Sequence, residues 1–257
     1  FGTVYRGFYR GHEVAIKQLK EDALAGGSLA PQQLQELRKE LNALRKLKHP
    51  RLIHFFGACL QVPTVCLVME FMAGGSLYNL LHVTKFALAR RDQYRIALQT
   101  NEGLIFLHGF APPVVHRDLK TMNVLLDRSL HVKLCDFGLT QPLDSTHMNR
   151  NPDGESGSPR YMAPEMYDAG GKLTEKVDIW AMGCVWIEIF GGPLPHVECQ
   201  TIQQIMTKLV VQRQGPTLPA VPERLRMAIA QCLSFSSHTR ASAQEAYRCL
   251  KDSEAFG

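Results

Sequence analysis

Two short runs hold the residues best suited to chemistry, His116-Arg117-Asp118-Leu119-Lys120-Thr121-Met122-Asn123 and Asp136-Phe137-Gly138. Asp118 offers a carboxylate that can accept the proton of a hydroxyl group. Asn123 and Asp136 offer the hard oxygen ligands that Mg²⁺ prefers. Phosphoryl transfer needs these parts, because it depends mostly on positioning and charge neutralisation. The spacing therefore predicts phosphoryl transfer from a Mg²⁺-bound triphosphate.

The two runs resemble the signature of the protein kinase catalytic domain. The six fixed letters His-Arg-Asp-Leu-Lys-x-x-Asn arise by chance in only about a few chains of this length per million. The resemblance implies that Asp118 is the catalytic base and that Lys120 offsets charge on the transferred group. It also implies ATP as the phosphoryl donor, with Asn123 and Asp136 as the ligands of Mg²⁺.

A lysine and a glutamate upstream extend the resemblance. Lys17 ends the strand-like run Val14-Ala15-Ile16-Lys17 and would contact the α- and β-phosphates. From Gln32 to Lys48, leucines recur at about 3.5-residue spacing, which predicts an amphipathic helix. Glu40 lies beside that leucine stripe. Taken alone it is better read as a half-exposed carboxylate, whereas the resemblance implies an ion pair with Lys17.

The adenine site is given by the resemblance alone, since each residue in it could equally be an ordinary core residue. The turn-rich segment Met72-Ala73-Gly74-Gly75 corresponds to the hinge between lobes. The resemblance implies backbone contacts to adenine from Glu70 and Met72 and a gatekeeper position for Met69. The side chains expected to enclose the ring are those of Val4, Ala15 and Leu125.

The first residues match only the end of the glycine-rich phosphate loop of kinases, G-x-G-x-x-G-x-V. Gly2 and Val4 take its last two fixed positions. We therefore expect the chain to be part of a longer protein and to lack the first strand of the domain.

A polar segment, Leu139 to Met162, corresponds to the kinase activation loop. We expect Ser156 to be a regulatory phosphosite for an upstream kinase, with Ser145 and Thr146 as weaker candidates. Arg117 would receive the phosphate through charge-assisted hydrogen bonds. The alternative is that these hydroxyl groups are only solvated loop residues.

Three structural contacts are also implied by the resemblance. Ser158 is expected to contact Asp118 and Lys120 in the substrate-facing loop. Glu165, in Ala163-Pro164-Glu165, is expected to pair with Arg240. Asp178, at the start of an apolar helix, would anchor the backbone of the catalytic loop, although the helix dipole alone would also favour an acid there.

The subclass rests on softer signals. Lys120 together with Ser158 is typical of Ser/Thr specificity. The run Phe56-Gly57-Ala58-Cys59 and the segments 74–82 and 160–165 resemble the tyrosine-kinase-like group, which includes Raf and mixed-lineage kinases. Met122 suggests no strong demand for arginine upstream of the target. The alternatives are a pseudokinase or scaffold module and a dual-specificity or tyrosine kinase.

The elements that would position these residues predict an α+β fold with two lobes. Residues 1–72 would form a β-rich small lobe and residues 73–257 a helical large lobe. We expect strands in residues 1–17, on either side of Arg10-Gly11-His12, then at Leu52–Phe56 and Val65–Phe71. The main helices expected in the large lobe are Ile96–Leu107 and Val177–Phe190.

Composition narrows the function classes. The net charge of +5 comes from basic residues interleaved with acids, so we expect protein substrates with Ser or Thr and no nucleic acid. Seven cysteines without metal-type spacing indicate reduced thiols in a cytoplasmic protein, with Cys135 as a buried apolar residue. The longest apolar stretch, Ile179–Phe190, is broken by Glu188 and is too short to span a membrane.

Overall fold

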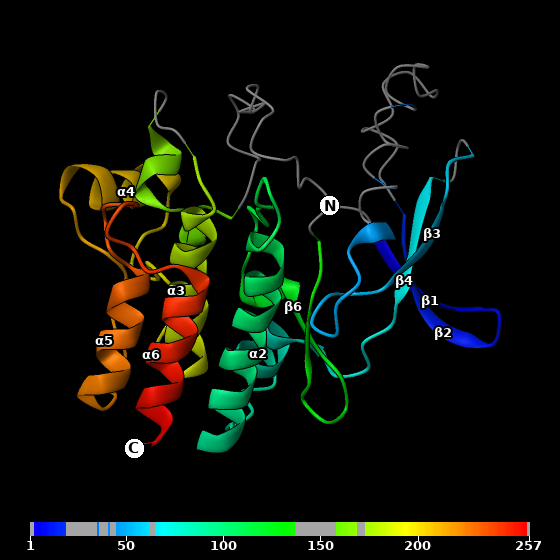
Figure 1. Cartoon of the computed structure of the whole chain (residues 1–257), viewed down its shortest axis with the longest axis horizontal. Helices are drawn as coiled ribbons and strands as arrows, with labels where there is room; N and C mark the ends of the chain where they lie inside the picture. Colours follow the sequence, from blue (N-terminus) through cyan, green and yellow to red (C-terminus); the bar gives the residue numbers. More distant parts are fainter. Residues whose placement is uncertain are drawn as a thin grey trace.

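The computed structural model of the chain describes residues 3–18, 35, 41, 45–61, 65–136, 158–168 and 173–255. Figure 1 shows the strands of one sheet at one end of the molecule and the long helices at the other. The described residues thus form a small antiparallel-sheet lobe and a larger helical lobe. The predicted α+β class with two lobes is confirmed.

The described part of the small lobe is an antiparallel sheet in the order β1-β2-β4-β3. The strands are Thr3–Tyr9 (β1), His12–Gln18 (β2), Phe55–Cys59 (β3) and Cys66–Glu70 (β4). The turn between β1 and β2 holds Arg10 at a φ of 49° and Gly11 at a φ of 82°. Two successive positive φ values give a tight hairpin turn whose twist matches that of the strands. The predicted hairpin is confirmed.

The prediction for the third strand was wrong in its bounds. The sequence suggested Leu52–Phe56, whereas β3 begins at Phe55 and ends at Cys59. Leu52 instead forms an isolated parallel bridge with Leu134, and the N–H of Ile53 donates to the carbonyl oxygen of Leu134 at 2.9 Å. Because this apolar segment pairs with the large lobe, it is not available to the sheet of the small lobe.

The connection between the lobes depends on close backbone contact. The N–H of Gly74 donates to the carbonyl oxygen of Leu126 at 2.8 Å. A Cβ atom on Gly74 would lie 2.5 Å from the carbonyl oxygen of Asp127, so only glycine fits there. The chain then enters β5 (Gly75–Ser76), which pairs with β6 (Val124–Leu126), and β6 pairs with β7 (Val132–Leu134).

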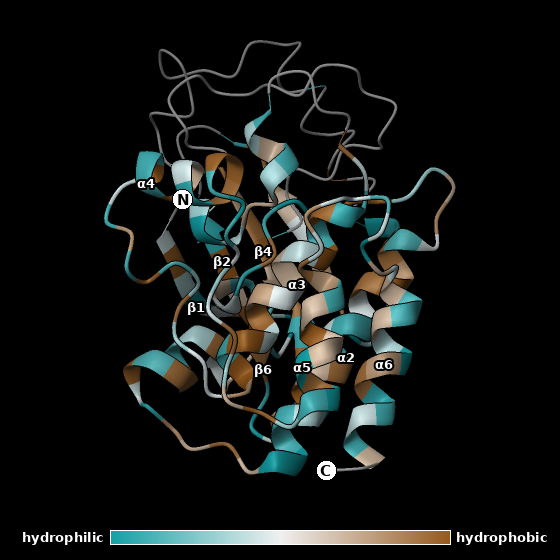
Figure 2. Cartoon of the chain, turned by 90° about the vertical axis from the view of Figure 1, so that its left-hand side faces the viewer, coloured by the Kyte–Doolittle hydropathy of each residue, from teal (hydrophilic) through white to brown (hydrophobic). Residues whose placement is uncertain are grey.

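Helices form most of the large lobe. The α-helices are Arg90–His108 (α2), Lys176–Ile189 (α3), Ile202–Met206 (α4), Glu223–Cys232 (α5) and Ala243–Ala255 (α6). Shorter turns of helix are Asn79–Val83 (η3), Thr121–Asn123 (η4), Pro159–Tyr161 (η5), Pro164–Tyr167 (η6) and Thr207–Val211 (η7). Figure 2 shows teal hydrophilic and brown hydrophobic positions alternating along α2, α5 and α6, as expected of helices with one solvent-facing side.

Helix α3 is the centre of this lobe, since all its residues from Val177 to Ile189 are buried. An apolar stretch that is buried all round is what the sequence predicted for Val177–Phe190. The core beside it includes the thiols of Cys184 in α3 and Cys232 in α5, whereas Cys59 at the end of β3 is exposed. All seven cysteines are free thiols. Among the described residues, no helix is both long and apolar enough to cross a membrane.

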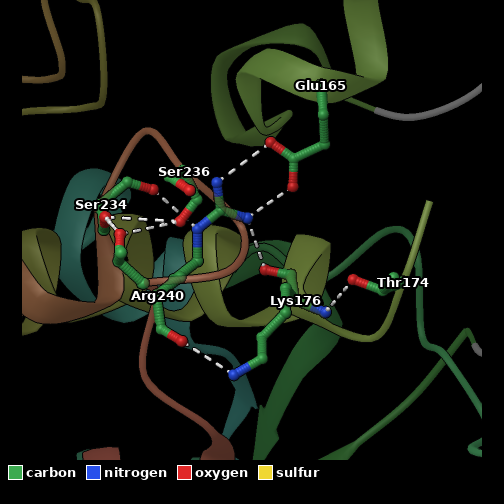
Figure 3. Close-up of polar contacts among 7 residues, drawn as sticks. Glu165, Thr174, Lys176, Ser234, Ser236 and Arg240 are labelled. Atoms are coloured by element: carbon green, nitrogen blue, oxygen red, sulfur yellow. Dashed lines mark hydrogen bonds and ion pairs between the residues drawn. The ribbon is translucent and has the colours of Figure 1, made fainter. Parts of the chain in front are cut away.

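The predicted ion pair between Glu165 and Arg240 is confirmed (Figure 3). The guanidinium group of Arg240 is 1% exposed and donates to both carboxylate oxygens of Glu165, at 2.6 Å and 3.0 Å. It also donates to the carbonyl oxygens of Lys176 and Ser234, and it lies 5.2 Å from the ring centroid of Trp180. The pair therefore ties η6 to the start of α3 and to the segment before α6.

Candidate active site

The catalytic loop, residues 115–123, follows α2 and is anchored by one buried carboxylate. Asp178 accepts hydrogen bonds from the backbone N–H groups of His116 at 2.7 Å and Arg117 at 2.8 Å. The carboxylate of Asp178 also contacts the Nε2 atom of His108, 2.8 Å away. Burial alone would raise the pKa of Asp178, but the hydrogen bonds from His108 and His116 outweigh it and lower the pKa. The expected anchoring role of Asp178 is confirmed.

Arg117 shows what this anchor holds in place. Its φ of 67° lies in the left-handed region, which is unfavourable for a residue with a long side chain. Such a conformation costs about 1–3 kcal/mol and persists only where the surroundings fix it. Here the N–H group of Arg117 is fixed by Asp178. The backbone is thereby turned immediately before Asp118.

Asp118 is surrounded by the residues that the sequence grouped with it. Its Oδ2 atom lies 2.7 Å from Nζ of Lys120 and accepts a hydrogen bond from Nδ2 of Asn123 at 3.0 Å. Its Oδ1 atom accepts the backbone N–H of Ser158 at 3.2 Å. Lys120 also donates to Oγ of Ser158 at 2.9 Å. The predicted contacts of Ser158 with the catalytic loop are confirmed.

The orientation of Asn123 follows from its neighbours. Its Nδ2 atom donates to the carbonyl oxygen of Asp118 at 2.7 Å as well as to the carboxylate. Both partners are acceptors, so the amide nitrogen must face Asp118 and the amide oxygen faces the other way. The N–H of Cys135 donates to the carbonyl oxygen of Asn123 at 3.0 Å. This bond brings the segment that carries Asp136 against the segment that carries Asn123.

Asp136 and Lys17 join the two lobes. Nζ of Lys17 lies 2.5 Å from Oδ1 of Asp136, and both side chains are mostly buried. Asp136 has a φ of 59°, a left-handed conformation that short polar residues tolerate better than others. A carboxylate and an amide oxygen on adjacent segments form a donor set that suits Mg²⁺. These residues therefore fit the metal that the sequence implied.

The strand register places the other small-lobe candidates on one face of the sheet. Val4 is directly opposite Lys17, and Ala15 is opposite Met69. Residues opposite one another across antiparallel strands share a face, as do residues two apart along a strand. Val4, Ala15, Lys17 and Met69 thus share the face from which Lys17 reaches Asp136. Leu125 is half-buried between the fully buried Val124 and Leu126 and packs against the edge of the core.

The hinge residues run from Glu70, the last residue of β4, to the start of β5. The side chain of Glu70 pairs with Lys133 at 2.8 Å and accepts the backbone N–H of His54 at 3.1 Å. Met72 is buried, and its carbonyl oxygen accepts the N–H of Gly75 at 3.1 Å. Cys135 is also buried as predicted, and burial raises the pKa of its thiol strongly.

Some residues of the predicted site lie outside the part of the chain that the structure describes. The positions outside the described residues are Gly2, Glu40, Phe137, Gly138, Ser145, Thr146 and Ser156.

A buried network behind the catalytic loop was missed by the sequence reasoning. Glu188 of α3 accepts hydrogen bonds from Thr121 at 3.0 Å and from the hydroxyl of Tyr161 at 2.7 Å, and it pairs with Nε2 of His82 at 2.6 Å. Burial and the nearby carboxylate raise the pKa of Tyr161, so the phenol stays protonated and donates. The signal in the sequence was Glu188 itself, the single charge in the apolar stretch Ile179–Phe190.

Arg160 fixes the segment that follows Ser158. Its guanidinium group donates to the carbonyl oxygens of Pro195 at 3.2 Å and Cys199 at 2.9 Å, and also to that of His196. The side chain of His196 is buried, and desolvation together with the cation of Lys208 lowers its pKa to about 4. The segment after Ser158 is therefore held against the chain that precedes α4.

Comparisons with known proteins agree with this geometry. The profile of a family described as protein tyrosine and serine/threonine kinase matches residues 1–250. A probable serine/threonine-protein kinase of Dictyostelium discoideum is 36% identical over 253 residues, 98% of this chain and 26% of the relative. The probable serine/threonine-protein kinase SIS8 of Arabidopsis thaliana is 33% identical over 251 residues, 98% of this chain and 24% of the relative.

A third relative is the serine/threonine-protein kinase CTR1 of Arabidopsis thaliana, 35% identical over 191 residues, which is 74% of this chain and 22% of the relative. The chain thus spans about a quarter of the length of these three curated relatives.

Proposed function

The chain belongs to the family of protein tyrosine and serine/threonine kinases, and on this premise we propose that it transfers the γ-phosphoryl group of ATP to Ser and Thr residues of proteins. Members of this family generally use ATP and Mg²⁺. One observation supports the activity above others. Asp118 is held by Lys120, Asn123 and Ser158 at hydrogen-bonding distance, on a loop anchored to the buried helix α3.

In this proposal Asp118 accepts the proton of the substrate hydroxyl group as the new bond to phosphorus forms. The cation of Lys120 keeps that carboxylate oriented and offsets negative charge on the group in transfer. Ser158 contacts both side chains, so it sets the approach of the substrate segment toward Asp118. The proposed roles of Asp118, Lys120 and Ser158 all depend on the short contacts among these three residues.

Mg²⁺-ATP, when bound, supplies the phosphoryl group and neutralises the charge that develops in the reaction. We propose that the amide oxygen of Asn123 and the carboxylate of Asp136 hold the metal. Lys17 would exchange its contact with Asp136 for one with the α- and β-phosphates, supported by Glu40. The proposed adenine and phosphate-loop contacts are those predicted above, from Gly2, Val4, Ala15, Met69, Glu70, Met72 and Leu125.

The proposed boundary between the lobes is at residues 72 and 73. Support comes from Gly74, whose backbone already pairs with β6 of the large lobe. We further propose regulation by an upstream kinase at Ser156, or at Ser145 or Thr146, with Arg117 as the phosphate receptor. An intracellular, cytoplasmic location fits free thiols in all seven cysteines and a requirement for ATP.

Specificity for Ser and Thr is supported by the contact between Lys120 and Ser158 and by the names of the relatives. The description of the family covers tyrosine kinases as well. Phosphoamino-acid analysis of the product separates the two. Phosphotyrosine would overturn the Ser/Thr assignment and leave the phosphoryl transfer intact.

The deciding experiment is Mg²⁺-dependent transfer from labelled ATP to a generic Ser/Thr protein substrate. The variant Asp118→Asn keeps the shape of the side chain and removes the base, so we expect the rate to fall by about 10²–10⁴-fold. A matched control is Asp252→Asn, an exposed aspartate on α6, which should retain the rate. Binding of ATP without transfer, even after phosphorylation by another kinase, would favour a pseudokinase or scaffold instead.

A further inference from the structure

On the outer side of the small lobe, a hollow of about 620 Å³ lies between the β1–β2 turn, the segment before β3 and β3 itself. We refer to it as the basic groove. Its lining consists of five basic and three aromatic residues: Arg10, His12, Arg45, Lys48, His54, Tyr9, Phe55 and Phe56. Among the described residues that line it, none is acidic. None of them belongs to the proposed active site.

In the described part of the chain, two cations of the basic groove lack an acidic partner. Among the described residues, neither Arg45 nor Lys48 has an ion pair, and both are exposed. The adjoining hollow is lined by two acids, and each already has a cationic partner, Glu13 with Arg6 and Glu70 with Lys133. Several cations that converge on one hollow without a counter-charge produce a positive potential that attracts an anion.

The aromatic lining is placed by two irregular features of the backbone. The pairing of β3 with β4 shifts between Phe55 and Gly57, so Phe56 is the extra residue of a bulge, a feature that re-aims side chains. The ring of Phe56 packs edge-on to His54 at 4.7 Å and lies 6.1 Å from Tyr9. Arg10 has a left-handed φ and lies 5.3 Å from the ring of Tyr9.

The size of the basic groove indicates more than a free phosphate ion. A second hollow of about 500 Å³ shares His12, Lys48, His54 and Phe56 with it and adds the half-buried apolar side chain of Leu47. Cationic groups beside apolar and aromatic surface suit an extended peptide that carries a phosphate on one residue and an apolar neighbour on the next. The concave shape fits a peptide better than a flat membrane surface.

We propose that the basic groove binds a peptide segment that carries phosphoserine or phosphothreonine. Arg10, Arg45 and Lys48 bind the phosphate group, and Phe56 with Leu47 contacts the flanking apolar side chain. The site lies apart from the proposed active site, and binding to it does not require phosphoryl transfer. Its test is therefore independent of the proposed function.

The probe is a fluorescein-labelled peptide with one phosphoserine flanked by leucine and phenylalanine, titrated with the whole chain without ATP and followed by anisotropy. We expect binding that weakens with added salt and is at least about tenfold tighter than that of the same peptide with serine. The double variant Arg45→Gln with Lys48→Gln should weaken binding by about tenfold or more. Arg10→Asn should also weaken it, because asparagine tolerates the left-handed turn but has no charge.

The matched control is Arg91→Gln with Arg128→Gln, which removes two exposed cations from the large lobe. It should leave the affinity within about twofold, because neither cation lines the basic groove and both are exposed and screened by salt. Equal affinity for the serine peptide, or equal loss in the control and groove variants, would overturn the proposal. Displacement of the peptide by inorganic phosphate at the same concentration, or preferred binding to phosphatidylserine vesicles, would overturn it as well.

Discussion

The catalytic loop and the β1–β2 hairpin both present proposed active-site residues, but they are held in place by different means. The catalytic loop is fixed by buried polar side chains of α3, since Asp178 is 1% exposed and Glu188 is 2% exposed. The hairpin presents Val4 on β1 and Lys17 on β2 through backbone register, and the side chains of β1 are largely exposed. Its own ion pair, Arg6 with Glu13, is at the surface.

The difference shows where substitution should be costly. Buried polar groups that lose a partner leave an unsatisfied donor or charge in a medium of low polarity. Exposed groups are solvated when they lose theirs. Polar substitutions around the catalytic loop should therefore lower stability and activity together, whereas those at exposed positions of the hairpin should leave stability nearly unchanged.

The largest effect should come from Asp178→Asn. The amide keeps one acceptor oxygen, but its NH₂ group faces the other of the two backbone N–H groups of His116 and Arg117, so that N–H group and the amide donor opposite it both lack an acceptor. At about 1–3 kcal/mol for each unsatisfied group, we expect the free energy of unfolding to fall by about 4 kcal/mol. Urea denaturation measures this, and phosphoryl transfer should be lost in parallel. A stable Asp178→Asn protein with a normal rate would remove the distinction between the two regions.

Breaking the pair of Glu165 and Arg240 should be the next largest effect. Glu165→Gln leaves the guanidinium group of Arg240 buried with its charge uncompensated, which should cost about 3 kcal/mol. The matched control is Glu223→Gln on α5, whose partner Arg226 is 3.9 Å away in an exposed pair. That variant should change the free energy of unfolding by less than about 1 kcal/mol. Similar losses in both variants would contradict the role of burial.

A pH titration of stability sharpens the comparison within the large lobe. His196 is buried and its pKa is lowered from 6.5 to about 4, so the unfolded chain takes up a proton that the folded chain does not. The free energy of unfolding should therefore fall as pH decreases from 6.5 toward about 4, with no further contribution from His196 below that. His196→Gln should flatten this part of the profile. An identical slope in wild type and variant would refute the assignment.

The smallest effect is expected on the hairpin. Arg6→Gln removes an ion pair whose side chains are 58% and 36% exposed, so thermal and urea midpoints should hardly change. The expected change in the free energy of unfolding is below about 0.5 kcal/mol. A loss as large as that of Glu165→Gln would show that the hairpin is held by side chains after all.

Much of the active site could be predicted because its parts are close in sequence or fixed by a motif. The contacts of Asp118 with Lys120 and Asn123 span five residues, and Ser158 and Asp178 were found through the motifs around them. The two-stranded hairpin was likewise readable from its turn. Local chemistry was sufficient in each case.

The features that the sequence did not predict correctly depend on contacts between segments that are distant along the chain. The run Leu52–Phe56 looks like a strand, but its first residues pair with β7, some 80 positions along the chain. The contacts of Glu188 with Thr121, Tyr161 and His82 could not be derived, because they require knowing which face of α3 meets the catalytic loop. A charged residue in an apolar stretch indicates that it has buried polar partners, but it does not identify them.

The cysteines of the unmodified protein differ in exposure, so their rates of modification can report local opening. Cys59 at the end of β3 is exposed, whereas Cys184 and Cys232 lie in the core of the large lobe and burial raises the pKa of both thiols. A thiol-specific reagent should modify Cys59 at once and the core thiols only when the helices separate. The lag between these modifications, read by mass spectrometry, times the opening of the large lobe without an engineered probe.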